Sequence, residues 1–199
     1  KMGFAGFEKT PTCEQFYVIT ANPADQSPIN GSSTLGSLMA DQSPFFETEP
    51  TLAEDTALII YTSGTTGKPK GAELTHLNLF SNAVLCADLF DYTTDDVNLI
   101  VLPMFHIFAM TCMMNAALYR GVHCLLLSKF DPEAVFMLMQ KYAVTVFGGV
   151  PTMYWGLLSY PEANKFDSSS LRVCLSGGAA LPVQVLKDFE AKYNVAILE

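Results

Sequence analysis

The sequence predicts an α/β fold in which a mainly parallel sheet carries helices on both faces. From residue 57 onward, short apolar segments of strand length alternate with segments whose apolar residues recur at helical spacing. These short segments are hydrophobic throughout, as is typical of strands covered on both sides. Half of the 199 residues are hydrophobic and only 16% are charged, which is enough for one sizeable domain with its own core.

Residues 1–56 are expected to form an irregular segment that belongs to the same large domain. The apolar run 16–20 predicts one strand, and residues 35–40 predict a short helix. Residues 22–33 are rich in Pro, Asn, Asp, Ser and Gly, so they predict a loop. A second loop is expected at 43–50.

Residues 57–199 are predicted to form an alternating β/α subdomain. Strands are expected at 57–62, 97–102, 122–127, 144–147, 171–176 and 195–198. Helices are expected at 75–89, 105–119, 151–160 and 182–193, and one more begins at Asp131. Parallel sheets bind ligands in the loops beyond the carboxyl ends of their strands, so the loops after Thr62 and Leu175 are candidate sites.

The predicted helices have recognisable starts and apolar faces. Thr75 is a suitable N-cap, and Asp131 followed by Pro132 and Glu133 is a strong helix start. Apolar residues spaced by three and four predict the side chains that face the core. They are Leu77, Phe80 and Val84 in the first helix, Val135, Leu138, Met139 and Tyr142 after Asp131, and Val185, Leu186 and Phe189 in the last helix.

Charge and cysteine content narrow the class of protein. The formal net charge is −9 and there is no dense Lys/Arg run, which argues against a nucleic-acid partner. The five cysteines are odd in number and contain no C-x-x-C pair, so neither a disulfide framework nor a zinc site is expected. Buried, reduced thiols in a cytoplasmic protein are predicted instead. No metal-ligating residue is assigned.

One uncharged stretch, between Asp96 and Arg120, is long enough to cross a bilayer. Pro103, His106 and Asn115 interrupt it. It is therefore interpreted as a strand, a turn and a buried helix, and no membrane span is expected. This interpretation leaves peripheral association with a membrane open.

The strongest chemical signal is the segment Tyr61–Gly71, which contains three glycines, four Ser or Thr hydroxyls and two lysines. It follows what is predicted to be a buried strand. Glycines allow close backbone approach, successive amides can form an anion nest, and a lysine adds positive charge. A polyphosphate site is therefore predicted, the alternative being a surface turn of small polar residues. Its residues are Thr62, Ser63, Gly64, Thr65, Thr66, Gly67 and Lys68.

This segment is not a Walker A loop, because only two residues separate Gly64 from Gly67 and Pro69 follows Lys68. It closely resembles the phosphate-binding motif of the adenylate-forming (AMP-binding) superfamily. That superfamily includes acyl- and aryl-CoA ligases, adenylation domains of peptide synthetases and beetle luciferases. The chain is most similar to acyl-CoA synthetases of the long-chain fatty acid–CoA ligase type.

Three further segments resemble that superfamily. Residues 103–109 are similar to the segment that lies beside the acyl carboxylate, which gives His106 that role; a core histidine bonded to backbone is the alternative. The resemblance makes His106 and Lys68 the candidate catalytic residues. The other two segments, residues 147–154 and 176–182, also suit plain strand-to-helix turns. For residues 147–154 the resemblance implies an acyl pocket lined by Phe147, Gly148, Val150 and Met153. For residues 176–182 it implies an adenine contact made by Gly177, Gly178 and Ala179.

The resemblance begins clearly at Ala57 and covers the remainder of the sequence. The superfamily's Gly-Tyr-Gly-x-Thr-Glu loop, whose Glu holds Mg²⁺, its ribose-binding Asp and its small C-terminal domain with a catalytic Lys are not in the sequence. The chain also ends on the strand 195–198. A fragment of the large N-terminal domain is therefore expected. The missing C-terminal domain would be needed for catalysis, and the isolated chain is predicted to be nearly inactive.

The resemblance implies that the parent enzyme activates a carboxylic acid, most simply a fatty acid, with ATP and Mg²⁺. The acyl-adenylate would then pass its acyl group to coenzyme A. Two alternatives remain open, namely an adenylation domain that loads a carrier protein and a nucleotide-binding module without turnover. Aromatic, medium-chain and long-chain acids are all compatible with the sequence.

Overall fold

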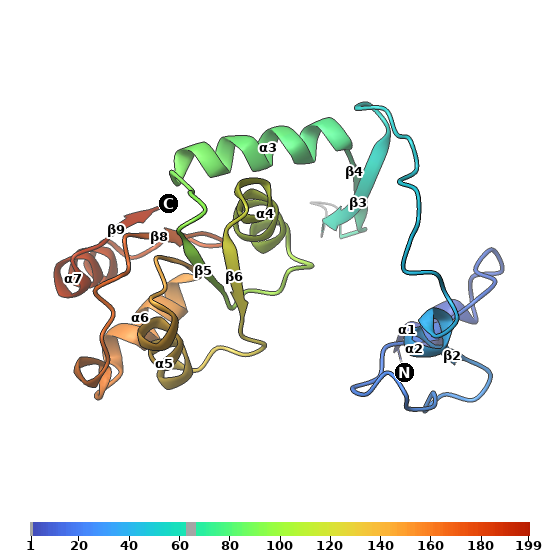
Figure 1. Ribbon diagram of the computed structural model, residues 1–199, viewed down its shortest axis with the longest axis horizontal. Helices are drawn as coiled ribbons and strands as arrows, with labels where there is room; N and C mark the ends of the chain where they lie inside the picture. The colour runs from blue at the N-terminus through green and yellow to red at the C-terminus, as the bar shows by residue number, and fades with distance from the viewer. Residues whose placement is uncertain (1, 63–66) are drawn as a thin grey trace. The chain divides into compact units, whose positions relative to one another are not determined.

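Five parallel strands form the central sheet in the order β6-β5-β7-β8-β9 (Figure 1). They are β5 (Val97–Ile100), β6 (His123–Leu126), β7 (Val146–Gly149), β8 (Val173–Ser176) and β9 (Ala196–Leu198). The chain passes from β5 to β6 on one side and then crosses to β7 on the other side, so the winding reverses between β5 and β7. A reversal of this kind opens a crevice at the carboxyl ends of the strands. The predicted fold class is confirmed.

Side chains alternate along each strand, and both faces of the sheet are covered. Leu99, Phe147 and Cys174 belong to a core shared with one group of helices. Their neighbours Ile100 and Val146 belong to a second core on the opposite face. The first group is α5 (Pro132–Tyr142), α6 (Pro151–Ser159) and α7 (Val183–Tyr193); the second is α3 (His76–Leu89), the π-helix η1 (Ala109–Asn115) and α4 (Ala116–Arg120). A short 3₁₀ turn, η2 (Ala163–Lys165), follows α6.

The computed structural model describes residues 2–62 and 67–199 and divides into two units, Lys1–Pro50 and Thr51–Glu199. In the smaller unit, Phe4 packs edge-on against Phe16 with ring centroids 5.3 Å apart. The expected helix at 35–40 is confirmed, whereas the expected strand at 16–20 is only two residues long and the first helix was not predicted. The elements are α1 (Met2–Phe7), β1 (Tyr17–Val18), β2 (Ser33–Thr34), parallel to β1, and α2 (Leu35–Met39).

The predicted helix starts are confirmed at Thr75 and Asp131. The Thr75 hydroxyl accepts a hydrogen bond from the Asn78 amide, and the Asn78 side chain accepts one from the Thr75 amide, which together form a capping box. The Asp131 side chain accepts from the Ala134 amide at 2.9 Å. Both helices therefore begin where short polar side chains satisfy the free amides of the first turn.

The buried face of α3 differs from the prediction. Ala83, Cys86 and Ala87 are buried, while Leu77 and Phe80 are 49% and 57% exposed. The helix lies against η1 and α4, and small side chains allow that close approach. Helical periodicity alone therefore selected the wrong face. In the helix after Asp131, Val135 and Met139 are buried as predicted, but Tyr142 is 38% exposed.

The helix predicted at 105–119 is largely a π-helix, η1, that continues into α4. Such segments are rare and often lie at functional sites. The buried Asn98 side chain of β5 donates a 2.9 Å hydrogen bond to the backbone carbonyl of Met113 within η1. None of the helices in the described part of the chain combines the length and hydrophobicity needed to cross a bilayer.

The strand predicted at 57–62 is present, but its environment is not the predicted one. β3 (Thr56–Thr62) pairs antiparallel with β4 (Lys70–Thr75) in a separate two-stranded sheet at the start of α3. Ile59 and Tyr61 are 51% and 73% exposed, so this strand is not buried. Its apolar composition suggested a central strand, whereas β4, which lacks an apolar run, was not predicted.

Candidate functional site

A pocket of about 440 Å³ lies at the carboxyl edge of the five-stranded sheet. Its walls come from the segments that follow β5, β7 and β8; the reversal of winding lies between β5 and β7, and β8 is next to β7. The lining residues are Leu102, Pro103, Phe105, His106, Phe108, Val150, Pro151, Thr152, Gly178 and Ala179. The structure therefore brings together three sequence segments that are far apart in the chain. This is where a doubly wound sheet is expected to bind its ligand.

His106 is the imidazole in this mainly apolar wall. Its Nδ1 accepts a hydrogen bond from the Phe108 amide at 3.2 Å. The neutral ring that makes this bond carries its hydrogen on Nε2, which leaves one donor for a ligand. The His106 amide donates to the Pro103 carbonyl at 2.9 Å and closes the turn that follows β5. His106 is exposed, so it is not the buried core histidine that the sequence left as an alternative.

The loop after β8 approaches the segment after β5 closely. A Cβ atom at Gly177 would lie 3.1 Å from two ring carbons of Phe108. The Gly177 amide also donates to the Gly149 carbonyl at 3.3 Å, which ties this loop to β7. Gly178 and Ala179 then continue along the pocket wall, both exposed. A flat ligand could therefore lie against backbone here without meeting a side chain.

Three of the four residues expected to form the acyl pocket lie behind its wall. Phe147 is fully buried in the core that faces α5–α7, and Met153 packs against that core. Gly148 is also buried, and a Cβ atom there would overlap the end of the Met113 side chain. Val150 is the member of this set that lines the pocket.

Several pocket residues were not predicted from the sequence, above all Phe105, Phe108 and Thr152. Phe105 is 85% exposed, which is unusual for a large apolar side chain within an apolar segment. All three lie within two residues of a residue already assigned to the site, so their position within the motif could have identified them as pocket residues. Periodicity could not separate them from core residues because the segment is apolar throughout.

The predicted phosphate segment lies on the separate hairpin. Thr62 ends β3, and Gly67 and Lys68 precede β4; all three are exposed. Ser63, Gly64, Thr65 and Thr66 lie outside the described residues. The pocket wall described above takes its residues from 102–108, 150–152 and 178–179, so the structure does not bring Lys68 to it.

Metal ligation has no support in the described ranges 2–62 and 67–199. No three His, Cys, Asp or Glu side chains there lie close enough together to hold a metal ion. The Mg²⁺ implied by the resemblance therefore finds no ligand set in this part of the chain. The apolar walls and exposed backbone of the pocket suit an acyl chain or a flat aromatic ring instead.

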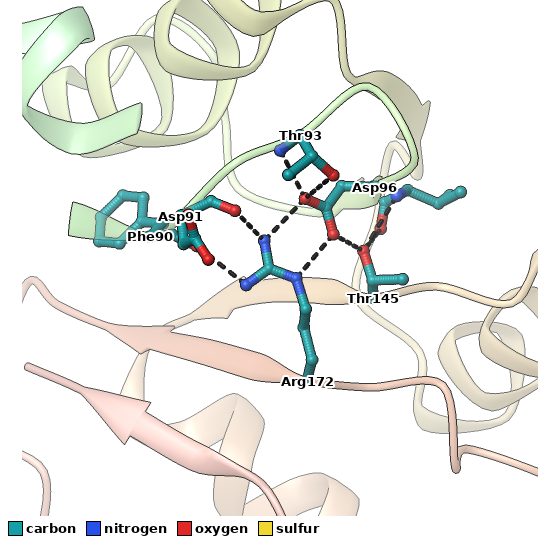
Figure 2. Close-up of polar contacts among 7 residues, drawn as sticks. Phe90, Asp91, Thr93, Asp96, Thr145 and Arg172 are labelled. Carbon is teal, nitrogen blue, oxygen red and sulfur yellow. Dashed lines mark hydrogen bonds and ion pairs between the residues drawn. The ribbon is translucent and has the colours of Figure 1, made fainter. Parts of the chain in front are cut away.

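The amino edge of the same sheet carries a closed polar network (Figure 2). Asp96, which precedes β5, is 3% exposed and accepts two 2.7 Å hydrogen bonds from Arg172, which precedes β8. The Thr145 hydroxyl before β7 donates to Asp96 at 2.6 Å, and the Thr93 amide donates at 2.8 Å. Arg172 also donates to the backbone carbonyls of Phe90 and Asp91.

This network stabilises the ionised carboxylate. Burial by itself would raise the pKa of Asp96, but the hydrogen bonds from Arg172, Thr145 and Thr93 outweigh burial and lower the pKa to about 2. Every oxygen of the carboxylate has a donor. The Asp96 carboxylate thus has no free oxygen to offer a ligand, and its role is structural.

Comparison with known proteins gives consistent matches. A family model described as AMP-binding enzyme matches residues 8–199. A long-chain-fatty-acid–CoA ligase from Bacillus subtilis (strain 168) is 43% identical over 138 residues, which cover 68% of this chain and 25% of that enzyme. 4-Coumarate–CoA ligase 4 from Arabidopsis thaliana is 36% identical over 148 residues, which cover 72% of this chain and 26% of that enzyme.

Solved structures share the fold over most of the chain. ATP-bound MatB from Rhodopseudomonas palustris is 36% identical with a TM-score of 0.75, covering 84% of this chain and 33% of that one. The inhibitor-bound N-terminal domain of FACL13 from Mycobacterium tuberculosis is 29% identical with a TM-score of 0.76, covering 87% of this chain and 45% of that one. The chain therefore spans about a quarter of the curated relatives named above and less than half of either structure.

Proposed function

Because this chain belongs to the AMP-binding enzyme family, we propose that the intact protein activates a carboxylic acid with ATP and transfers the acyl group to coenzyme A. The relatives named above are acid–CoA ligases, which supports coenzyme A over a carrier protein as the thiol acceptor. The free cysteines support a reducing cytoplasm as the place of action.

A single observation carries the proposal. The pocket at the reversal of winding joins the segment that contains His106 to the loop that contains Gly178 and Ala179. The first segment resembles the acyl-carboxylate region of the superfamily, and the second resembles its adenine-contacting region. An acyl-adenylate contains both groups in one molecule, so one pocket with both walls suits it.

The acid that we propose is an apolar, fatty one. Five of the ten lining residues are Leu102, Phe105, Phe108, Val150 and Pro151, and none of these five carries a charge that could pair with a second charged group on the acid. A second hollow of about 610 Å³ follows the carboxyl ends of β5 and β6, and its lining is also mainly apolar. Burial of hydrocarbon against such walls favours binding by about 25 cal/mol per Å².

The two chemical steps place different demands on the chain. In the first, an oxygen of the carboxylate attacks the α-phosphorus of ATP, and pyrophosphate leaves. The hydrogen on Nε2 of His106 would hold the acid's carboxylate in place for this attack. Lys68 and the hydroxyls of Ser63, Thr65 and Thr66 would hold the leaving pyrophosphate, an assignment that depends on the motif. In the second, the thiol of coenzyme A attacks the acyl carbonyl and AMP leaves.

Hydroxamate trapping with the intact protein tests the proposal. With ATP, hydroxylamine and a panel of fatty, aromatic and dicarboxylic acids, we expect hydroxamate to form best with an apolar fatty acid. Replacement of His106 by Ala should lower kcat/KM for the acid about tenfold or more, since a hydrogen bond to a charged group is lost. His123→Ala is the matched control, because His123 is exposed at the opposite edge of the sheet.

Two outcomes separate the alternatives. ATP binding without hydroxamate from any acid would favour a nucleotide-binding module without turnover. Hydroxamate formation followed by acyl transfer to a phosphopantetheinyl carrier protein, but not to coenzyme A, would favour a carrier-loading domain. The isolated 199-residue chain is expected to form little adenylate, because it spans only about a quarter of the length of the acid–CoA ligases named above.

A further inference from the structure

Two thiols are in contact between α3 and η1, two of the helices that cover one face of the sheet. The sulfur of Cys86, on α3, lies 3.6 Å from the sulfur of Cys112, on η1. Cys86 is 7% exposed, whereas Cys112 is half-buried. The two residues are 26 positions apart in sequence, so the contact is made by the packing of two separate helices. The proposed ligase chemistry uses neither thiol.

The surroundings give the two sulfurs different roles. The Cys86 thiol has two acceptors within reach, the side-chain oxygen of Asn82 at 3.6 Å and the sulfur of Cys112. The hydroxyl of Thr111 lies 3.6 Å from the Cys112 sulfur but donates to the Ile107 carbonyl at 2.8 Å. The hydrogen bond from Cys86 lowers the pKa of Cys112. That bond and burial raise the pKa of Cys86. Cys112, which is the less buried of the two and accepts the hydrogen bond from Cys86, is therefore the thiol that ionises more readily.

The remaining cysteines in the same unit lack these properties. Burial raises the pKa of Cys124, and its thiol donates to the Val122 carbonyl at 3.7 Å. Burial also raises the pKa of Cys174, which is fully buried on β8. A thiolate with access to solvent and a second thiol in contact with it is the arrangement that peroxides oxidise selectively.

We propose that Cys86 and Cys112 form a peroxide-sensitive dithiol that closes to a disulfide between α3 and η1. The Cys112 thiolate attacks one oxygen of hydrogen peroxide, and after uptake of one proton this gives Cys112 sulfenic acid and water. The Cys86 sulfur then attacks the Cys112 sulfur, the S–O bond breaks, and the oxygen leaves as a second water with the Cys86 proton. Two thiols are oxidised by two electrons and one peroxide is reduced.

Closure should affect the pocket. A disulfide holds its sulfurs about 2 Å apart, so the two side chains, or the helices that carry them, must shift to close the present 3.6 Å separation of the sulfurs. η1 begins one residue after Phe108, which lines the pocket, and α3 begins directly after β4 of the hairpin. Oxidation is therefore expected to lower acid activation by a factor of several. This consequence rests on the proposed function, whereas the disulfide itself does not.

Peptide mapping of the intact protein tests the dithiol directly. After brief treatment with micromolar hydrogen peroxide, free thiols are blocked with N-ethylmaleimide and the protein is digested without reductant. We expect a peptide pair joined through Cys86 and Cys112 that dithiothreitol separates. In Cys86→Ser, dimedone should instead label Cys112 as a sulfenic acid. Cys124→Ser is the matched control, and it should leave the joined pair in place.

Three results would overturn the proposal. The first is that Cys86 and Cys112 both remain free for alkylation at peroxide levels that already oxidise the exposed Cys13. The second is a disulfide between Cys112 and Cys124 in place of the expected one. The third is dimedone labelling in Cys86→Ser that is no greater than in Cys112→Ser. Circular dichroism of each variant establishes that it is folded. If the disulfide forms but hydroxamate formation is unchanged by it, the regulatory consequence is wrong. If no acid is activated at all, the proposed function fails while the disulfide result stands.

Discussion

The two edges of the five-stranded sheet involve the same three strands but differ in their polar groups: those at the amino edge bond to one another, whereas the carboxyl edge holds a pocket with a free donor. Asp96, Thr145 and Arg172 directly precede β5, β7 and β8, and they bond to one another and to nearby backbone. The same strands end at the pocket, where the His106 imidazole keeps a free donor and the loops approach through glycines. The strands are four residues long, so roughly 13 Å separates the two arrangements.

The difference shows how the fold separates stability from binding. A buried charge is tolerated at the amino edge because all its hydrogen bonds are made within the protein. At the carboxyl edge, the His106 imidazole keeps a donor for a ligand, and the buried Ser176 hydroxyl at the end of β8 has no partner among the described residues. The buried Tyr92 hydroxyl before β5 also lacks one, so the contrast between the edges rests on the charged groups. Substitutions at the amino edge should therefore change the free energy of unfolding. Substitutions at the carboxyl edge should mainly change kinetic constants.

The largest effect is expected from Arg172→Ala, which would leave Asp96 buried without its main partner. We expect a loss of about 3 kcal/mol in the free energy of unfolding, because removal of the Arg172 side chain, itself 36% exposed, leaves the buried Asp96 charge unpaired. Urea unfolding measures the loss. Arg120→Ala is the matched control, because Arg120 and its partner Asp88 are 41% and 57% exposed and should contribute less than about 1 kcal/mol. Equal losses in the two variants would contradict a structural role specific to the amino edge.

The next effect concerns pH. The folded pKa of Asp96, about 2, lies below its ordinary value of 3.8. A depressed pKa stabilises the folded state above the unfolded pKa, and this contribution is lost as pH falls from about 4 to about 2. The difference amounts to about 2 kcal/mol. Urea unfolding at pH 4, 3 and 2 should show a steeper loss in the unmodified protein than in Asp96→Asn. Parallel losses in both proteins would show that other carboxylates cause the effect.

A third test lies between the two edges, at Gly148 of β7. A Cβ atom there would lie 2.6 Å from Cε of Met113, which is fully buried. Gly148→Ala should therefore cost about 1–3 kcal/mol through overpacking. Adding Met113→Val should recover part of this loss, although a shorter side chain alone would leave a small cavity. A double-mutant cycle by urea unfolding measures the coupling, and additive losses would show that the two residues do not compete for space.

Prediction from the sequence worked best where strands and helix caps were concerned. The five parallel strands, the caps at Thr75 and Asp131 and the inward position of Phe189 could all be predicted because they depend on local patterns. The network around Asp96 could not be predicted, since its members lie 49 and 76 residues away along the chain. The π-helix η1 could not be predicted either, because its apolar sequence fits an ordinary α-helix equally well.

The candidate site shows the same division. Motif resemblance placed His106, Val150, Gly178 and Ala179 on segments that the fold does bring together. It could not distinguish pocket wall from core, so Phe147 was assigned to a wall although it lies behind it. The assumption that every apolar strand joins one sheet failed at β3, which pairs with β4 in a separate two-stranded sheet. Strand partners are decided by tertiary contacts that composition does not record.

The smallest effect on stability, and the most informative one for function, is expected at Gly177. In Gly177→Ala, the new methyl group would lie 3.1 Å from the Phe108 ring and would push that ring toward the pocket. The ring has open space on its pocket side, so unfolding should change by less than about 1 kcal/mol. The lost volume should raise KM for the acid and lower kcat/KM about tenfold, or about 1.4 kcal/mol in transition-state stabilisation. Adding Phe108→Leu should restore kcat/KM by returning that volume. If Gly177→Ala instead destabilised the protein as strongly as Arg172→Ala with unchanged kinetics, the carboxyl edge would be as structural as the amino edge, and the separation between the two would be lost.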